Sequence, residues 1–101
     1  VFFAADNGCS PEADFPQLAA AGHHPSGPFR GHKADLFEGG HRVPFFARWP
    51  GRIAAGSTYS HPVGLTDLLA TCADLLRLPL PDNAAEDSVS LLPVLLGKTD
   101  D

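Results

Sequence analysis

The sequence of 101 residues predicts an α/β fold. Val1 to Ala5 is an uninterrupted apolar run, typical of a strand buried on both faces in a parallel sheet. Leu65 to Leu78 carries leucines at helical spacing. Asp6, Asn7 and Gly8 directly follow the first strand, and ligands of open α/β sheets bind at the carboxyl ends of strands. We therefore expect a ligand site at the end of the first strand.

The next predicted element is a short helix between Ser10 and Gly22. Asp14 can accept hydrogen bonds at its start, and Pro16 suits a first helical turn. Gly22 can end it, since glycine readily adopts the left-handed conformation found after helices. His23 to Gly31 is rich in proline and glycine, which predicts a loop.

The second half of the chain predicts one further strand and two helices. The strand is expected over Val43 to Trp49, with Pro44 at its entry, where a missing N–H is tolerated. Thr66 or Asp67 can cap the leucine-rich helix. A last short helix is expected from Ser90 to Leu96.

Two features suggest that residues 1–101 are an incomplete domain. The chain begins inside its first predicted strand, and a strand buried on both faces needs neighbours on each side. Few other segments can supply those neighbours. We therefore interpret the chain as a piece of a longer protein.

Composition narrows the class of function. The formal net charge of −5 argues against a nucleic-acid binder, which normally shows a basic face. No apolar run approaches the roughly 20 residues of a membrane segment. The two cysteines give no disulfide framework, and Cys72, among leucines, is expected to be buried. Basic residues cluster between Arg30 and Arg52, which suits a small anionic substrate.

The residues after the first strand have the chemistry of a metal site. Asp6 and Asn7 offer hard oxygen ligands of the kind that Ca²⁺ and Mg²⁺ prefer. Taken alone, the same residues are more typical of a tight turn than of a metal site. Lys33 lies downstream between Gly31 and a Glu-Gly-Gly sequence, and an ammonium group there can hold an anion.

Four blocks follow one another in the chain: Asp6-Asn7-Gly8, Arg30-Gly31-His32-Lys33, Leu36 to Phe45, and Arg48-Trp49-Pro50-Gly51. Taken together and in this order, they resemble the later conserved blocks of the type I sulfatase family. These are the arylsulfatase-like members of the alkaline phosphatase superfamily. The resemblance implies an α/β/α sandwich with a mostly parallel central sheet, of which residues 1–101 are the C-terminal portion of the catalytic domain.

The resemblance also implies an activity, which is hydrolysis of a small-molecule or carbohydrate sulfate ester with one divalent cation, usually Ca²⁺, with Mg²⁺ possible. Asp6 and Asn7 match the later pair of metal ligands in the family. Lys33 matches the lysine that contacts the sulfate. The formylglycine nucleophile arises from a Cys-x-Pro-x-Arg motif that belongs to the missing N-terminal portion. Cys9 precedes Ser-Pro but no arginine follows, so we expect Cys9 to be a loop thiol.

Two other classes of function remain open. Phosphate and phosphonate hydrolases of the same superfamily resemble this layout but carry histidine where Asn7 stands. A non-catalytic pseudoenzyme or binding module would keep the fold without the nucleophile. The resemblance suggests a periplasmic or extracellular protein, and the piece alone is expected to be inactive. The sequence assigns no oligomeric state and no role to the histidines His23, His24, His32 and His41.

Overall fold

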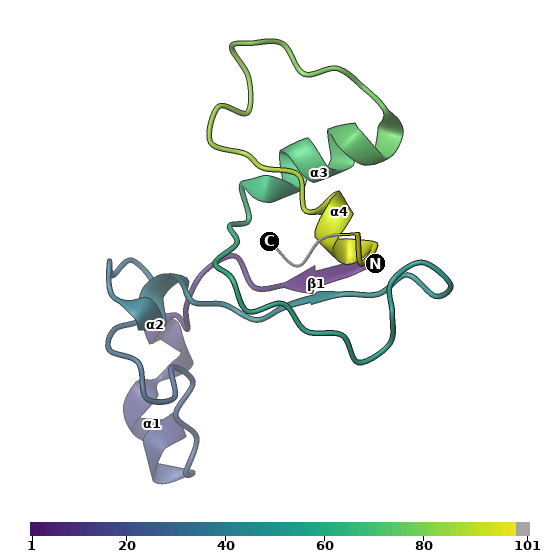
Figure 1. Ribbon diagram of the computed structural model, residues 1–101. Helices are drawn as coiled ribbons and strands as arrows, with labels where there is room; N and C mark the ends of the chain where they lie inside the picture. The colour runs from purple at the N-terminus through teal and green to yellow at the C-terminus, as the bar shows by residue number, and fades with distance from the viewer. Residues whose placement is uncertain (99–101) are drawn as a thin grey trace. The chain divides into compact units, whose positions relative to one another are not determined.

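The computed structural model describes residues 1–98, and the chain divides into two compact units. One unit comprises residues 2–46, and the other comprises Val1 and the chain from Ala47 onward. None of the helices in the described part is long and apolar enough to cross a membrane. In chain order the elements are β1 (Phe2–Ala4), the 3₁₀ helix η1 (Pro11–Ala13), α1 (Phe15–Ala20), α2 (Glu38–His41), β2 (Phe45–Ala47), α3 (Asp67–Leu76) and α4 (Leu92–Leu95) (Figure 1).

The strands β1 and β2 pair as a two-stranded antiparallel sheet. Just outside the strands, the Val1 nitrogen donates to the Arg48 carbonyl and the Arg48 N–H donates to the Val1 carbonyl, each at 2.8 Å. Such a mutual exchange is characteristic of antiparallel pairing. The two strands thus supply no parallel pair, and the mostly parallel central sheet stays a prediction.

Both faces of this sheet are apolar and at least partly exposed. Phe3 lies against Phe46 on one face with ring centroids 6.1 Å apart, and Phe2 approaches Phe45 on the other at 5.7 Å. Phe3 and Phe46 are 63% and 64% exposed, Phe2 is 41% exposed, and Phe45 is half-buried. The prediction that the first strand is buried on both faces is therefore wrong for residues 1–98, because the described chain covers little of its side chains.

The helix α1 forms as its sequence predicts. The Asp14 carboxylate accepts a hydrogen bond from the Gln17 N–H at 3.2 Å, which satisfies one of the free amides of the first turn. Pro16 occupies that first turn. Gly22 follows the helix with φ of +77°, a conformation that glycine adopts without strain.

The helix α3 is shorter than its predicted range of 65–78. Arg77 adopts the left-handed conformation with φ of +56°, and the Leu78 N–H donates to the Ala73 carbonyl at 2.8 Å. This pattern closes a helix end. Pro79 follows, as expected for a residue that cannot continue a helix.

The side chains buried on α3 are small ones. Ala70, Thr71 and Ala73 are buried, whereas Leu69 is 54% exposed and Leu76 is 65% exposed. Cys72 is exposed, so the prediction that it is a buried thiol is wrong. The reason is that the segment before α4 packs over the small side chains.

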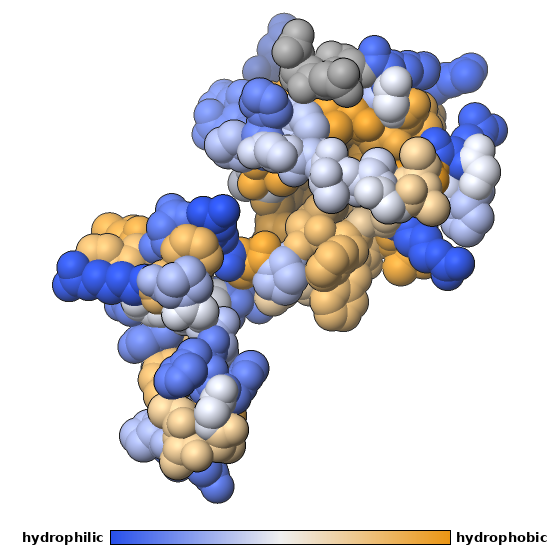
Figure 2. Space-filling view, turned by 60° about the horizontal axis from the view of Figure 1, so that its bottom comes forward, coloured by the Kyte–Doolittle hydropathy of each residue, from blue (hydrophilic) through white to orange (hydrophobic). Residues whose placement is uncertain are grey.

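Hydrogen bonds hold that segment on α3. Asp67 accepts the Val89 N–H at 2.9 Å through Oδ1 and the Gly64 N–H at 2.8 Å through Oδ2. The Leu91 N–H donates to Thr71 Oγ1 at 2.9 Å. Leu69 and Leu76 on α3 remain exposed. Figure 2 shows broad apolar areas on this face of the molecule.

Candidate active site

The two predicted metal ligands follow β1 directly. Asp6 is exposed and Asn7 is half-buried. The Asn7 amide nitrogen donates to the Gly8 carbonyl at 3.0 Å, so Asn7 Oδ1 is left to meet a ligand. No hydrogen bond or ion pair from another residue within 1–98 engages the Asp6 carboxylate. Both residues thus offer an oxygen in the form a hard cation requires.

Backbone hydrogen bonds join the Asp-Asn-Gly segment to two others. The Gly8 N–H donates to the Gly40 carbonyl at 2.8 Å, which connects the end of β1 to α2. The Lys33 N–H donates to the Cys9 carbonyl at 3.0 Å. The main chain of Lys33 therefore lies beside the segment that carries Asp6 and Asn7.

The site needs glycines because main-chain segments approach each other closely here. A Cβ on Gly8 would clash with the carbonyl oxygen of Gly39, and a Cβ on Gly40 would clash with the carbonyl oxygen of Asp35. A larger side chain at either position would push these segments apart. The Glu-Gly-Gly sequence thus belongs to the site because it allows close packing of main chain.

Lys33 lies in a tight turn with an exposed side chain. The Asp35 N–H donates to the His32 carbonyl at 2.9 Å, which closes the turn. The imidazole of His32 stacks on Phe15, with ring centroids 4.9 Å apart. Lys33 is therefore presented on a loop that is anchored on both sides.

Ion pairs and stacked side chains brace α2 beside this loop. Arg42 Nη1 lies 3.2 Å from Glu38 Oε2, and His41 Nε2 lies 3.4 Å from Glu38 Oε1. The guanidinium carbon of Arg42 is 4.5 Å from the centroid of the Phe29 ring. Glu38 and Arg42 thus interact with each other and stabilise this turn.

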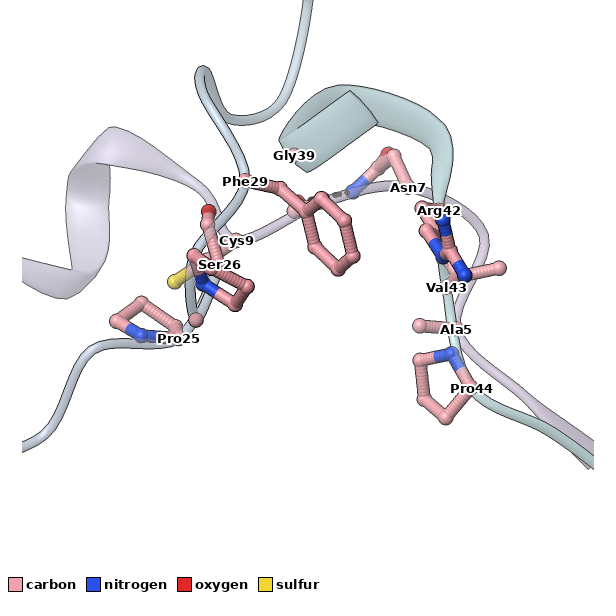
Figure 3. Close-up of a pocket in the computed structure, with 13 residues that line it drawn as sticks. Ala5, Asn7, Cys9, Pro25, Ser26, Phe29, Gly39, Arg42, Val43 and Pro44 are labelled. Atoms are coloured by element: carbon pink, nitrogen blue, oxygen red, sulfur yellow. Dashed lines mark hydrogen bonds between the residues drawn. The ribbon is translucent and has the colours of Figure 1, made fainter. Parts of the chain in front are cut away.

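A pocket of about 430 Å³ opens next to Asn7. Its walls come from the loop residues 25–29 and from residues 42–44, and its lining includes Asn7 and Cys9. Figure 3 shows the Phe29 ring reaching into the pocket between Cys9 and Arg42. Cys9 is half-buried here, and its thiol approaches the Ser10 carbonyl at 3.8 Å.

This chain provides at most part of a metal site. Residues 1–98 contain no group of three or more His, Cys, Asp and Glu side chains placed to hold an ion. Asp6 and Asn7 supply two oxygens, and Ca²⁺ takes six to eight ligands in proteins. The donor set fits a hard cation as a partial shell. The histidines are dispersed: His23 and His24 are exposed in the loop, and His41 pairs with Glu38.

Comparison with known proteins identifies the family. The sulfatase family model matches residues 1–78. The chain belongs to the sulfatase family. It is 37% identical over 101 residues to an N-acetylgalactosamine-6-O-sulfatase of Bacteroides thetaiotaomicron. It is 41% identical over 100 residues to the N-acetylgalactosamine-6-sulfatase of Canis lupus familiaris and 36% identical over 97 residues to the steryl-sulfatase of Mus musculus.

These alignments cover nearly all of the sulfatase chain but only a small part of each relative. They span 97%, 96% and 96% of this chain, and 20%, 18% and 15% of the respective relatives. A solved Bacteroides thetaiotaomicron structure, from a study of glycosaminoglycan metabolism, superposes with a TM-score of 0.81 at 36% identity. The superposition covers 99% of this chain and 21% of the solved chain.

Two residues that shape the site were not predicted from the sequence. Asp35 caps the Lys33 turn, and the Ser26 hydroxyl donates to the Gly31 carbonyl at 2.8 Å. Asp35 had a usable signal, since Asp and Asn commonly bond to backbone groups within tight turns. Ser26 had none, because its partner is determined by the path of the loop.

Proposed function

We propose that this sulfatase chain is the later portion of a catalytic domain that hydrolyses sulfate esters with one divalent cation. Asp6 and Asn7 would hold that cation, Ca²⁺ or Mg²⁺, together with ligands from the rest of the domain. Lys33 would bind the sulfate. The nucleophile, a formylglycine, would come from outside residues 1–101.

One observation supports the proposal most directly. The Lys33 main chain is hydrogen-bonded to Cys9, two residues from Asn7, although Lys33 and Asn7 are far apart in the sequence. The predicted sulfate-binding residue and the predicted metal ligands thus belong to one hydrogen-bonded unit. Membership of the sulfatase family adds to this support.

The chemistry assigned to these residues follows from the charge that develops in the reaction. Cleavage of a sulfate ester builds negative charge on the sulfuryl oxygens and on the leaving oxygen. A bound cation would supply fixed positive charge to oxygens in its shell. Lys33 would place an ammonium group against the sulfuryl oxygens, and such preoriented charge stabilises a transition state better than water does.

The substrate class is a sulfate ester of a small molecule or a carbohydrate. The pocket beside Asn7 is open and has both apolar and polar walls, so it would accept part of the leaving alcohol. The similar proteins are named for sulfates of N-acetylgalactosamine and of sterols, which are chemically dissimilar alcohols. Sulfate is the group that they share. The resemblance to exported enzymes leads us to propose a periplasmic or extracellular location.

Asn7 also bears on the alternative of phosphate ester hydrolysis. An amide oxygen suits one hard cation, whereas a zinc-like second ion prefers the nitrogen of histidine. Sulfate esters are therefore favoured over phosphate esters.

Replacement of Lys33 tests the proposal in the complete enzyme. We expect Lys33→Ala to lower kcat/KM for 4-nitrophenyl sulfate by about 100-fold or more, the scale for loss of one oxyanion-stabilising group. Lys98→Ala, at the other lysine of the chain, is the matched control and should retain wild-type kinetics. Unchanged kinetics in Lys33→Ala would rule out its role. Faster hydrolysis of 4-nitrophenyl phosphate than of the sulfate would favour the alternative.

A further inference from the structure

The turn that presents Lys33 is closed in both directions by Asp35. Asp35 Oδ2 accepts the His32 N–H at 2.9 Å, and the Asp35 N–H donates to the His32 carbonyl at 2.9 Å. Two reciprocal hydrogen bonds thus span the residues on either side of Lys33 and Ala34. A side-chain acceptor of this kind is a common means of holding a tight turn.

The turn needs such support because its backbone is strained. Ala34 has φ of +75°, a conformation that costs free energy for any residue with a Cβ. A turn of this kind favours glycine at that position. The surrounding contacts must therefore hold Ala34 in place, and the Asp35 carboxylate makes one of the two hydrogen bonds that close the turn, each 2.9 Å long.

Packing leaves the carboxylate little freedom. A Cβ on Gly31 would lie 3.0 Å from Asp35 Oδ2, so the glycine backbone lies directly against this oxygen. His32 Nδ1 is 3.6 Å from the same oxygen and 3.0 Å from the Lys33 carbonyl. The carboxylate and the imidazole together bracket the main chain of Lys33.

We infer that Asp35 is a positioning residue for Lys33 and acts through the turn rather than on the substrate. This inference rests on the proposed role of Lys33 in binding sulfate. Lys33 is anchored on one side by the hydrogen bond from its N–H to Cys9. Asp35 fixes the other side, so the direction of the lysine side chain depends on its carboxylate. Displacement of a catalytic group by about 1 Å can reduce rates about 100-fold.

Variants of Asp35 in the complete enzyme separate the hydrogen bond from the charge. We expect Asp35→Ala to lower kcat for 4-nitrophenyl sulfate about 10-fold to 100-fold, since the turn loses its acceptor. Asp35→Asn keeps an acceptor oxygen and should retain most of kcat. Asp35→Glu keeps the charge but shifts the oxygens by one methylene, so it should lower kcat. Equal loss in Asp35→Asn and Asp35→Ala would overturn the assignment.

Asp14→Ala is the matched control. Asp14 also accepts a backbone N–H three residues away in the same unit, but it caps α1 and does not touch the Lys33 turn. It should leave kcat at the wild-type value. A loss of kcat in Asp14→Ala as large as in Asp35→Ala would mean that general destabilisation causes both, and would overturn the inference.

A double-mutant cycle distinguishes this inference from the proposed function. If Asp35 acts through Lys33, Asp35→Ala should have almost no further effect on kcat in a Lys33→Ala background. Additive losses would overturn the inference and leave the role of Lys33 intact. If Lys33→Ala alone has wild-type kinetics, the proposed function is wrong. This result does not depend on any Asp35 variant, so the two failures can be distinguished.

A rescue variant keeps the test decisive if Asp35→Ala folds poorly. Ala34→Gly removes the strain at the turn, so Asp35→Ala combined with Ala34→Gly should regain part of the lost kcat. Circular dichroism and the melting temperature report folding of each variant. A folded double variant with kcat no higher than that of Asp35→Ala would contradict the positioning role.

Discussion

Single residues at the end of β1 carry the chemistry proposed for this sulfatase. Asp6 is exposed and has no partner among residues 1–98, while the nitrogen of the Asn7 amide is already hydrogen-bonded. A surface carboxylate without a partner gains little in folding free energy from its position. Its position therefore leaves the carboxylate free for the cation that we propose.

The metal assignment predicts the effect of Asp6→Ala. In the complete enzyme, stripped of metal, we expect Ca²⁺ to bind about tenfold more weakly or worse, because one charged ligand is lost. Isothermal titration with CaCl₂ measures the affinity. Asp6→Asn keeps the oxygen without the charge and should fall between wild type and Asp6→Ala. Glu12→Ala, which removes an acid of the neighbouring helix η1, is the control. An unaltered titration for Asp6→Ala would contradict the ligand assignment.

At the scale of elements, α3 shows how a helix start depends on a distant segment. The Ser88 hydroxyl accepts the Ala70 N–H at 2.9 Å and donates to the Thr66 carbonyl at 2.7 Å. The hydroxyl thus bridges the Ala70 N–H and the Thr66 carbonyl, which would otherwise hydrogen-bond to each other within the helix. Together with Asp67, this hydroxyl fastens the segment before α4 to the first turn of α3.

The two bonds to the Asp67 carboxylate predict a local loss of stability in Asp67→Asn. A carboxylate accepts on both oxygens, whereas an amide accepts on one only, so the Val89 N–H or the Gly64 N–H loses its acceptor. We expect a cost of about 1 kcal/mol, because both bonds are exposed to water, and faster amide hydrogen exchange around Val89. Hydrogen-exchange mass spectrometry of the complete enzyme measures this effect.

Asp74→Asn is the control for that experiment. Asp74 lies on the same helix and accepts the Ser90 hydroxyl at 2.6 Å through one oxygen, a bond that an amide oxygen can replace. Exchange should therefore stay near the wild-type rate. If Asp67→Asn exchanges no faster than Asp74→Asn, the carboxylate does not hold the segment.

At the scale of the whole chain, little apolar side-chain surface is buried. Ala70, Ala73 and Leu91 are the buried hydrophobic residues of the described part. Phe3 and Phe46 on the β1–β2 sheet and Leu69 and Leu76 on α3 remain exposed, and the chain spans about a fifth or less of each similar sulfatase. Apolar surface of this kind is stabilising only when other parts of a domain cover it.

The exposed apolar surface predicts the behaviour of the 101-residue chain when it is expressed alone. We expect no cooperative thermal unfolding as a monomer, strong binding of the dye ANS, and no hydrolysis of 4-nitrophenyl sulfate. Calorimetry and analytical ultracentrifugation test the first point. A sharp calorimetric transition from a monomer would show that the chain folds on its own and would contradict this prediction.

The sequence predicts local features because the residues that form them are close together in the chain. The Asp14 cap, the glycine after α1 and the residue order of the family blocks depend on a few neighbouring positions. The prediction of an α/β fragment of a sulfatase depends on such blocks, and the family match confirms the sulfatase part.

The sequence does not predict which distant segments pair with each other. The antiparallel direction of β1 and β2, the burial of Thr71 in place of the leucines, and the bond from Lys33 to Cys9 each join residues far apart in sequence. Helical spacing shows that a face is apolar but not which segment will cover it. These pairings are set by how the connecting chain folds back, because hydrogen bonds and burial are satisfied only in three dimensions.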